Sequence, residues 1–167
     1  MTHRSSATLD TPLGTMLIEA SESGLTRIAW SSDSPAAPGS ADSEAHLEAG
    51  CKWVRAYFAG KRARSPTLDL TSLTPFQADV VDSLRRIAPS GTVVSYADLA
   101  SAAGRPGASR AVGTVMATQP WPLLVPCHRV VRADGWIGDY SACEGAATKE
   151  WLLSHEGNRI RKGRIIR

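Results

Sequence analysis

The strongest constraint on the fold is a change of hydrophobic period partway along this 167-residue chain. From residue 7 to residue 30, apolar and polar residues alternate around two turn signals, TPLG and SESG. Such alternation is typical of half-buried strands, so this stretch predicts a small antiparallel sheet. A sheet of this size needs a helix packed on its apolar face, because a few short strands are barely stable alone in water.

That helix is expected in the segment EAHLEAGCKWVRAYFAG, residues 44–60. Apolar residues recur there near helical spacing: Leu47, Cys51, Val54, Tyr57 and Phe58. We interpret Cys51 as a core residue of this helix. The segment before it, SSDSPAAPGSADS, is rich in Ser, Pro, Gly and Ala and predicts a loop.

The second half of the chain has a helical pattern. KRARSPTLDLTSLT reads as a linker, which places a domain boundary between residues 1–72 and residues 73–167. TPFQADVVDSLRRIAP then predicts a helix with Thr74 as its N-cap and Pro75 at its first position. Further on, KEWLLSHEG predicts a last helix that closes the fold, with Gly157 as its C-cap.

Two short helical segments, YADLASAAG and GASRAVGTVMATQ, lie on either side of RPG. A pair of helices joined by a tight glycine-containing turn is the form of a helix-turn-helix, whose second helix would be the recognition helix. From the pattern alone, plain packing of two alanine-rich helices remains an alternative.

Charge is divided unevenly between the two halves. Residues 1–72 hold 7 Lys and Arg against 8 Asp and Glu, whereas residues 73–167 hold 12 against 8 and end in NRIRKGRIIR. The net charge of +4 on the second half suggests an acidic partner, and a solvated basic tail is the alternative.

Composition limits the class of protein. Apolar residues make up 43% of the chain, which argues against a disordered protein, and no run approaches the roughly 20 apolar residues of a membrane span. The start MTHRSSATLD has no apolar signal core, and three widely spaced cysteines favour free thiols. The four histidines have no metal-binding spacing. We therefore expect an intracellular, cytoplasmic protein without a metal or a cofactor.

The chemistry-bearing stretch is LLVPCHRVV, residues 123–131. Its apolar run predicts a buried strand, and Pro126 predicts a break before Cys127, His128 and Arg129. The thiolate is the reactive form of cysteine, and a nearby histidine can serve as the base that generates it. Neighbours in sequence seldom face each other in regular structure, so His128 needs an irregular backbone or a water to reach Cys127. From these residues alone, a structural cysteine beside a surface histidine is the alternative.

PCHRVV, with ASRAVG before it and KEWLLSHEG after it, resembles the O6-alkylguanine-DNA alkyltransferases. TPLG, TPFQADV and SYADLASAAGRPGASRAVG follow in family order, so the resemblance covers nearly the whole chain. It implies an α/β N-terminal domain with a small ribonuclease H-like sheet and a mostly α C-terminal domain with a winged helix-turn-helix. The implied activity is DNA repair by irreversible, single-turnover transfer of an alkyl group from O6 of guanine to a cysteine.

The resemblance also implies roles for individual residues. Cys127 is the nucleophile, His128 its base through a water, Glu156 the group that orients His128, and Tyr96 a proton donor near the base. The target nucleotide must leave the duplex to be reached. The residues expected to contact DNA are Arg110, which fills the vacated place, with Ala111, Tyr96 and Gln119. The residues expected to line the substrate pocket are Met116, Val130, Tyr140 and Ser141. Arg129 is expected to fasten the turn through neighbouring carbonyls.

The sequence departs from the family pattern at two places near the site. Gln119 stands where relatives commonly have Asn, with the same amide on a longer stem. In DYSACEGAATKEW, Ala142 and Cys143 replace a common Gly-Gly pair, and the loop is about two residues longer. This altered loop predicts slower transfer than in relatives with Gly-Gly, because glycine reaches left-handed backbone angles without strain.

The expected partner is double-stranded DNA with O6-alkylguanine, and O4-alkylthymine is a further candidate lesion. We expect no membrane partner and a monomer in solution, with cooperative binding along DNA as a further possibility. The alternative function is sensing of alkylated bases by a DNA-binding protein of the same fold without efficient transfer. A more distant alternative is a Cys-His hydrolase of small esters.

Overall fold

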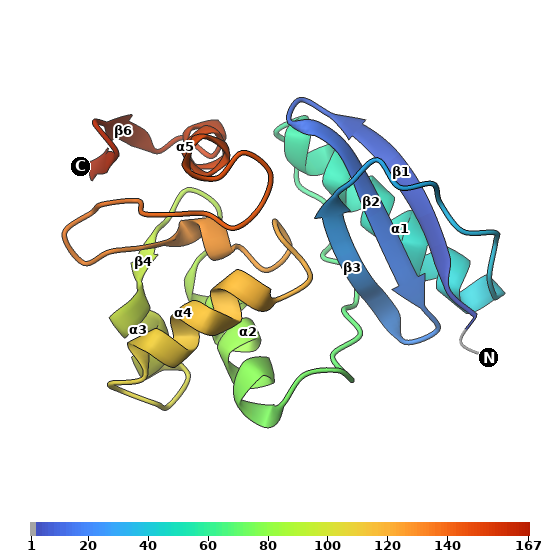
Figure 1. The fold of residues 1–167 in the computed structure, drawn as a ribbon, viewed down its shortest axis with the longest axis horizontal. Helices are drawn as coiled ribbons and strands as arrows, with labels where there is room; N and C mark the ends of the chain where they lie inside the picture. Colours follow the sequence, from blue (N-terminus) through green and yellow to red (C-terminus); the bar gives the residue numbers. More distant parts are fainter. Residues whose placement is uncertain (1–2) are drawn as a thin grey trace. The chain divides into compact units, whose positions relative to one another are not determined.

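The computed structural model describes residues 3–167, which form two compact units with the boundary between Ser72 and Leu73 (Figure 1). None of the helices in this part of the chain combines the length and apolar character needed to cross a membrane.

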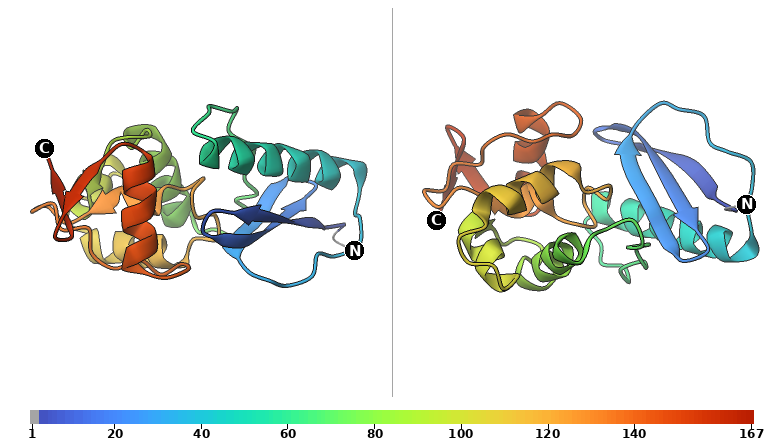
Figure 2. Two further views of the ribbon diagram at one scale, coloured as in Figure 1. Left: turned by 90° about the horizontal axis from the view of Figure 1, so that it is seen from above. Right: turned by 60° about the horizontal axis from the view of Figure 1, so that its bottom comes forward.

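The first unit is a three-stranded antiparallel sheet in the order β1-β2-β3 with one helix against it (Figures 1 and 2). Its elements are β1 (Ser5–Thr11), β2 (Gly14–Ser21), β3 (Gly24–Trp30) and α1 (Ala41–Phe58). The turns fall at the predicted TPLG and SESG signals, where Gly14 and Gly24 have φ values of 115° and 144°. The predicted sheet and its covering helix are confirmed.

Helix α1 packs closely on the sheet. A Cβ atom at Gly50 would lie 2.8 Å from the side chain of Leu25, so the absence of a side chain there permits the contact. Cys51 is buried in the core of this unit, as predicted. Part of the predicted linker is ordered against the sheet, since the backbone N–H of Leu25 donates to Thr67 O and that of Asp69 donates to Leu25 O.

The second unit is mostly helical. Its elements are α2 (Pro75–Ile87), β4 (Val94–Ser95), α3 (Tyr96–Ala102), α4 (Ser109–Thr118), a 3₁₀ turn η1 (Cys127–Arg129), β5 (Val130–Val131), α5 (Ala146–His155), β6 (Arg159–Arg161) and β7 (Arg164–Ile166). Helix α2 begins as predicted, because Thr74 and Gln77 form a reciprocal capping box and Pro75 occupies its first turn. Helices α3 and α4 form the predicted helix-turn-helix.

A short parallel ladder brings together two segments that are far apart in sequence. Val94 in β4 pairs with Val130 in β5, and Ser95 pairs with Val131. Strand β4 runs directly into Tyr96, and β5 directly follows the Cys127–Arg129 turn. The ladder therefore places the start of α3 beside the cysteine.

Two predictions about this unit are wrong. The apolar run at residues 123–125 is buried, but it is a turn rather than a strand, and Leu123 has a φ of 76°. The chain also does not close with α5, because β6 and β7 form an antiparallel hairpin after it. A run of three apolar residues indicates burial, not backbone conformation. An interpretation of residues 159–167 by their charge alone misses the hairpin pattern that they contain.

Candidate active site

The backbone around Cys127 is irregular, as Pro126 predicted. Pro126 has φ −78° and ψ 62°, and the Cys127 N–H donates to Val125 O at 2.7 Å, which is an inverse γ-turn. The N–H of Arg129 then donates to Pro126 O at 2.9 Å and closes the 3₁₀ turn. The proline ring favours the φ value that the γ-turn requires. This turn places Cys127, His128 and Arg129 on consecutive buried positions.

The sulphur of Cys127 lies among groups that favour its thiolate. Burial raises the pKa of Cys127, while a hydrogen bond from Gln119, the charge of Lys149 and a hydrogen bond from Tyr140 lower it. The Gln119 Nε2 donates to Sγ at 3.3 Å, and Gln119 Oε1 accepts from the Trp121 N–H at 2.7 Å. The net shift is upward, so the resting sulphur holds its proton and needs a base to release it.

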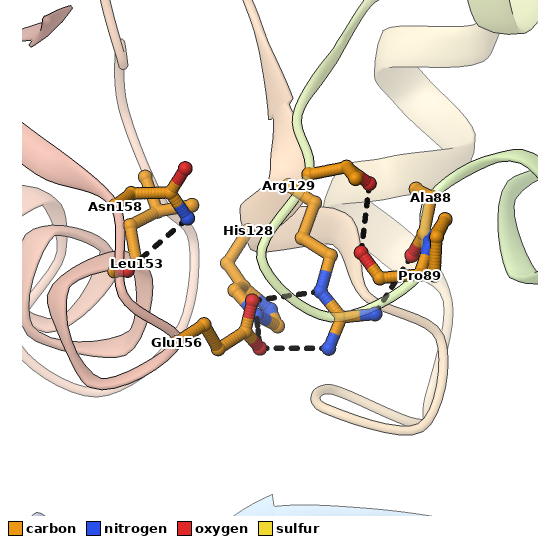
Figure 3. A network of polar contacts seen from close by, with 8 residues as sticks. Ala88, Pro89, His128, Arg129, Leu153, Glu156 and Asn158 are labelled. Atoms are coloured by element: carbon orange, nitrogen blue, oxygen red, sulfur yellow. Dashed lines mark hydrogen bonds and ion pairs between the residues drawn. The ribbon is translucent and has the colours of Figure 1, made fainter. Parts of the chain in front are cut away.

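His128 is paired with Glu156 at the end of α5 (Figure 3). His128 Nε2 lies 2.7 Å from Glu156 Oε1, and both side chains are almost fully buried. Burial opposes ionisation of Glu156, but hydrogen bonds from His128 and Arg129 outweigh it and lower its pKa to about 2. Because the carboxylate accepts, Nε2 must carry the hydrogen in this pair.

The other ring nitrogen of His128 is available as a base. Burial lowers the pKa of His128 despite the opposing effect of Glu156, so the imidazole is neutral at neutral pH. With the hydrogen on Nε2, the lone pair is on Nδ1. Nδ1 is buried and has no hydrogen-bond partner among residues 3–167.

Arg129 holds the His128–Glu156 pair against the rest of the unit. Its Nε and Nη2 donate to the two oxygens of Glu156 at 2.8 and 2.7 Å, and its Nη1 donates to Ala88 O at 2.7 Å (Figure 3). This bidentate geometry fixes the carboxylate plane. The expected contacts were with carbonyls near the turn, but the carbonyl belongs to Ala88 at the end of α2, and the contact with Glu156 was not predicted.

A pocket of about 250 Å³ opens at the cysteine. Of the residues predicted for the site, it is lined by Tyr96, Met116, Cys127, Tyr140 and Ser141. Val130 is not among its lining residues, and its carbonyl instead accepts a hydrogen bond from Lys149 Nζ at 2.8 Å. The Ser141 hydroxyl donates to Ala117 O at 3.3 Å, which ties the loop after Tyr140 to α4.

Tyr96 is the first residue of α3 and is half-buried. Burial raises its pKa, and a negative charge at Cys127 would raise it further. The phenol therefore keeps its proton at neutral pH and can donate a hydrogen bond into the pocket. Its ring lies beside Gly113 of α4, where a Cβ atom would be 3.9 Å from the ring.

Helix α4 presents a face of small side chains around a single cation. Val112, Val115 and Met116 are buried, while Arg110, the second residue of the helix, is exposed. The other exposed residues of this helix are Ala111, Thr114, Ala117 and Thr118. No acidic residue occurs in α4, so this face can approach a polyanion closely.

Lys149 is a site residue that the sequence reasoning missed. It is 1% exposed, lines the pocket, and donates to Val130 O and, at 3.5 Å, to Asp139 O. Burial lowers its pKa to about 8, against the opposing effects of Cys127 and Asp139. Lys149 is thus largely cationic at pH 7. Only its position in a predicted helix that also holds apolar residues hinted at burial.

The loop after Tyr140 contains Ala142 and Cys143, the residues that stand where a Gly-Gly pair was expected from the resemblance. Cys143 has a φ of 51°, a left-handed angle that glycine adopts without strain. Cys143 is exposed, and the Gly145 N–H donates to Ala142 O at 3.1 Å. Within residues 3–167, no group of three or more His, Cys, Asp or Glu side chains could hold a metal ion.

The fold and the pocket define a helix-turn-helix protein in which a buried cysteine lines a pocket and the next residue is a buried histidine paired with a glutamate. Two family models match the chain: the 6-O-methylguanine DNA methyltransferase ribonuclease-like domain over residues 6–70, and the DNA-binding domain of the same enzyme over residues 75–158. The chain belongs to the 6-O-methylguanine DNA methyltransferase family.

Individual relatives agree with this assignment. The methylated-DNA–protein-cysteine methyltransferase of Mus musculus is 41% identical over 89% of this chain and 79% of its own length. A DNA base-flipping protein of Thermus thermophilus is 38% identical over 89% of this chain and 97% of its own. The structure of Mycobacterium tuberculosis OGT in complex with DNA is 31% identical, covers 89% of this chain and 90% of its own, and has a TM-score of 0.74.

Proposed function

We propose that this protein repairs DNA by transferring an alkyl group from O6 of guanine in a duplex to the sulphur of Cys127. The observation that carries the proposal is the arrangement around Cys127: a buried thiol in a pocket, a neutral histidine with its lone pair on Nδ1, and a buried cation. Membership of the methyltransferase family supports the reaction class.

The target base reaches the pocket by leaving the duplex. Cys127 is buried, so an alkyl group on a stacked base cannot meet it. We propose that Arg110, which is exposed at the start of α4, inserts into the gap that the flipped nucleotide leaves in the base stack. Ala111 and the other small exposed residues of α4 allow that helix to lie close against the groove.

The transfer is a nucleophilic substitution at the alkyl carbon. The Cys127 thiol passes its proton through a water molecule to Nδ1 of His128, and Glu156 stabilises the resulting imidazolium. The Sγ–carbon bond forms as the carbon–O6 bond breaks, and the electron pair of that bond leaves with the guanine. The charge of Lys149 and the hydrogen bond from Gln119 stabilise the developing thiolate.

The departing guanine needs its new negative charge compensated. Tyr96 lines the pocket and keeps its proton at neutral pH, so its phenol is the donor that we place at N3 of the base. Tyr140 and Ser141 line the same pocket and are assigned to holding the base. The product is a thioether with no good leaving group, so each molecule acts once. We expect it to act as a monomer.

The alternative function is sensing of alkylated bases without efficient transfer. It is favoured by the similarity to the Thermus base-flipping protein and by Cys143 in a left-handed conformation beside the pocket loop. O4-alkylthymine is a second candidate lesion for either function.

Intact-protein mass after incubation with duplex DNA that contains O6-methylguanine separates these functions. Repair adds the mass of one methyl group in place of hydrogen, and Cys127→Ser abolishes this gain while it retains DNA binding. Binding of the wild type without a change of mass would support sensing and overturn the transfer proposal. A protein that neither binds the duplex nor gains mass, but cleaves small esters, would be a hydrolase.

A further inference from the structure

The C-terminal hairpin carries an unusual share of the positive charge. Residues 159–167 contain five cations and no acidic residue, a charge of +5 against +3 for the whole chain. Residues 73–158, which include the pocket and the helix-turn-helix, hold 7 Lys and Arg against 8 Asp and Glu. Without the hairpin, the unit proposed to bind DNA would therefore carry a net negative charge. The hairpin also lies outside the segment that the family model matches.

The hairpin, next to the C-terminus in Figure 2, is attached to the rest of the second unit through its inner face. Ile160 and Ile165 pack on a buried cluster formed by Val131, Ile137 and Leu153. The Ile137 N–H donates to Gly163 O, and the Ile165 N–H donates to Gly135 O, both at 2.9 Å. Its position relative to the rest of the unit is thus fixed by backbone bonds and apolar packing. Arg164 adds side-chain contacts with Asp134 O, at 3.1 Å, and with the Trp136 ring.

The outer face carries three arginines and the exposed Ile166, which is the cross-strand partner of Arg159. Side chains alternate along a strand, so Arg159, Arg161 and Arg164 point away from the face that Ile160 and Ile165 bury. Arg161 and Arg164 are direct cross-strand partners, a placement that is destabilising for like charges. Within residues 3–167, only Arg164 of the hairpin has a carboxylate within ion-pair distance, Asp134 at 3.0 Å. An anionic ligand would relieve this repulsion.

A hollow of mixed charge lies between the hairpin and the start of α3. Arg167 and Arg132 line this hollow of about 420 Å³, together with Asp98, Asp134 and Ser95, the residue directly before α3. The next residue, Tyr96, lines the cysteine pocket. A polyanion that follows the hairpin and Arg132 would therefore reach the entrance of the site.

We propose that the β6–β7 hairpin and Arg132 form a second phosphate-binding surface, which holds the backbone of the same duplex whose base enters the Cys127 pocket. This inference rests on the proposed function. The contacts are charge-based and carry no sequence preference, because exposed arginine side chains facing phosphates read no base edges. DNA is favoured over other acidic ligands because Ser95 lines the hollow beside the hairpin and the next residue, Tyr96, lines the Cys127 pocket.

The test compares two variants with equal loss of charge. The hairpin variant is Arg159→Gln, Arg161→Gln and Lys162→Gln, which removes exposed cations that have no ion pair in the described chain. The control variant is Lys52→Gln, Lys61→Gln and Arg62→Gln, all exposed in the first unit. Affinity for an undamaged duplex is measured as a function of salt concentration.

Each phosphate contact contributes about 0.9 to the slope of log affinity against log salt. The hairpin variant is expected to lose roughly 2 to 3 from the magnitude of this slope, and the control variant to keep the wild-type slope. A further variant with Arg159→Lys and Arg161→Lys should keep it too, since the charge is preserved. Equal slopes for the hairpin and control variants would overturn the proposal, and they are also the result expected if the hairpin binds an acidic protein instead.

Transfer from the free base O6-benzylguanine distinguishes a failure of this inference from a failure of the proposed function. It needs no duplex, so the hairpin variant should transfer at the wild-type rate. If the wild type transfers nothing from any substrate while the salt slopes differ, the proposed function fails and the DNA-binding surface stands. Loss of free-base transfer in the hairpin variant alone would show damage to the pocket and count against the inference.

Discussion

Replacing Lys149 with methionine should slow alkyl transfer while leaving the stability of the protein nearly unchanged. Methionine has a similar length, so the substitution removes the charge and keeps most of the volume. At neutral pH, the lowering of the Lys149 pKa from 10.5 to about 8 corresponds to roughly 3 kcal/mol of unfavourable burial. The variant no longer has this unfavourable contribution to the folding free energy, but it leaves Val130 O without its donor, which costs about 1–3 kcal/mol. The two effects nearly cancel.

The effect on the rate follows from the charge that faces Cys127. Opposite unit charges lining one small pocket attract by on the order of 2 kcal/mol at an effective dielectric constant of about 20. Loss of this attraction should slow single-turnover transfer roughly thirtyfold at pH 7. Lys149 is cationic below its pKa of about 8, so the wild-type advantage should be present below that pH and disappear as the pH rises through it.

The assay is single-turnover transfer from O6-benzylguanine and from a duplex that contains O6-methylguanine, measured from pH 6 to pH 9.5. Lys61→Met, an exposed site in the first unit, is the matched control and should behave as the wild type. A Lys149→Met variant with the wild-type rate at pH 7, or with a constant rate ratio across pH 8, would show that Lys149 serves only packing.

Three further predictions follow from the same site. Arg110→Ala should slow transfer in duplex DNA much more than transfer from free O6-benzylguanine, because unstacking takes a few kcal/mol; equal losses would place Arg110 in the pocket chemistry. Gln119→Leu should raise the thiol pKa and slow transfer about tenfold, since it removes the donor to Sγ; an unchanged pH profile would refute this. Glu156→Gln should reduce the loss of unfolding free energy at low pH, measured by urea unfolding. The folded pKa of Glu156 is lowered, so roughly 3 kcal/mol of stability is present above about pH 4.5 and lost towards pH 2. If the unfolding free energy of this variant fell at low pH as steeply as that of the wild type, the assigned ion pair would be contradicted.

Much of the fold could be predicted because the local signals agree with the tertiary structure. The TPLG and SESG turns and the Thr74–Pro75 start of α2 depend on local chemistry that the sequence displays, whereas the helix-turn-helix was implied by the family resemblance and left open by the local pattern. The break at Pro126 follows in the same way from the restricted φ of proline. These elements needed no knowledge of distant residues.

The missed features depend on contacts between distant segments or on an overlooked pattern. Lys149 resembles an ordinary exposed helix lysine until the packing of α5 buries it against Val130. The bidentate contact between Arg129 and Glu156 joins residues 27 positions apart. The β6–β7 hairpin, however, had a readable signal: alternating Arg and Ile flank Lys162–Gly163, whose positive φ values of 50° and 73° suit a two-residue hairpin turn.

The most direct test of the central claim is peptide mapping by mass spectrometry after incubation with an equimolar duplex that contains O6-methylguanine. The arrangement around Cys127 predicts one methyl group per protein molecule, located on the peptide that holds Cys127, with Cys51 and Cys143 unmodified. Cys51 is buried in the first unit and burial raises its pKa, so it should not compete. Methyl on Cys51 or Cys143, or loss of the lesion from DNA without methylated protein, would contradict the assignment of Cys127 as the alkyl acceptor.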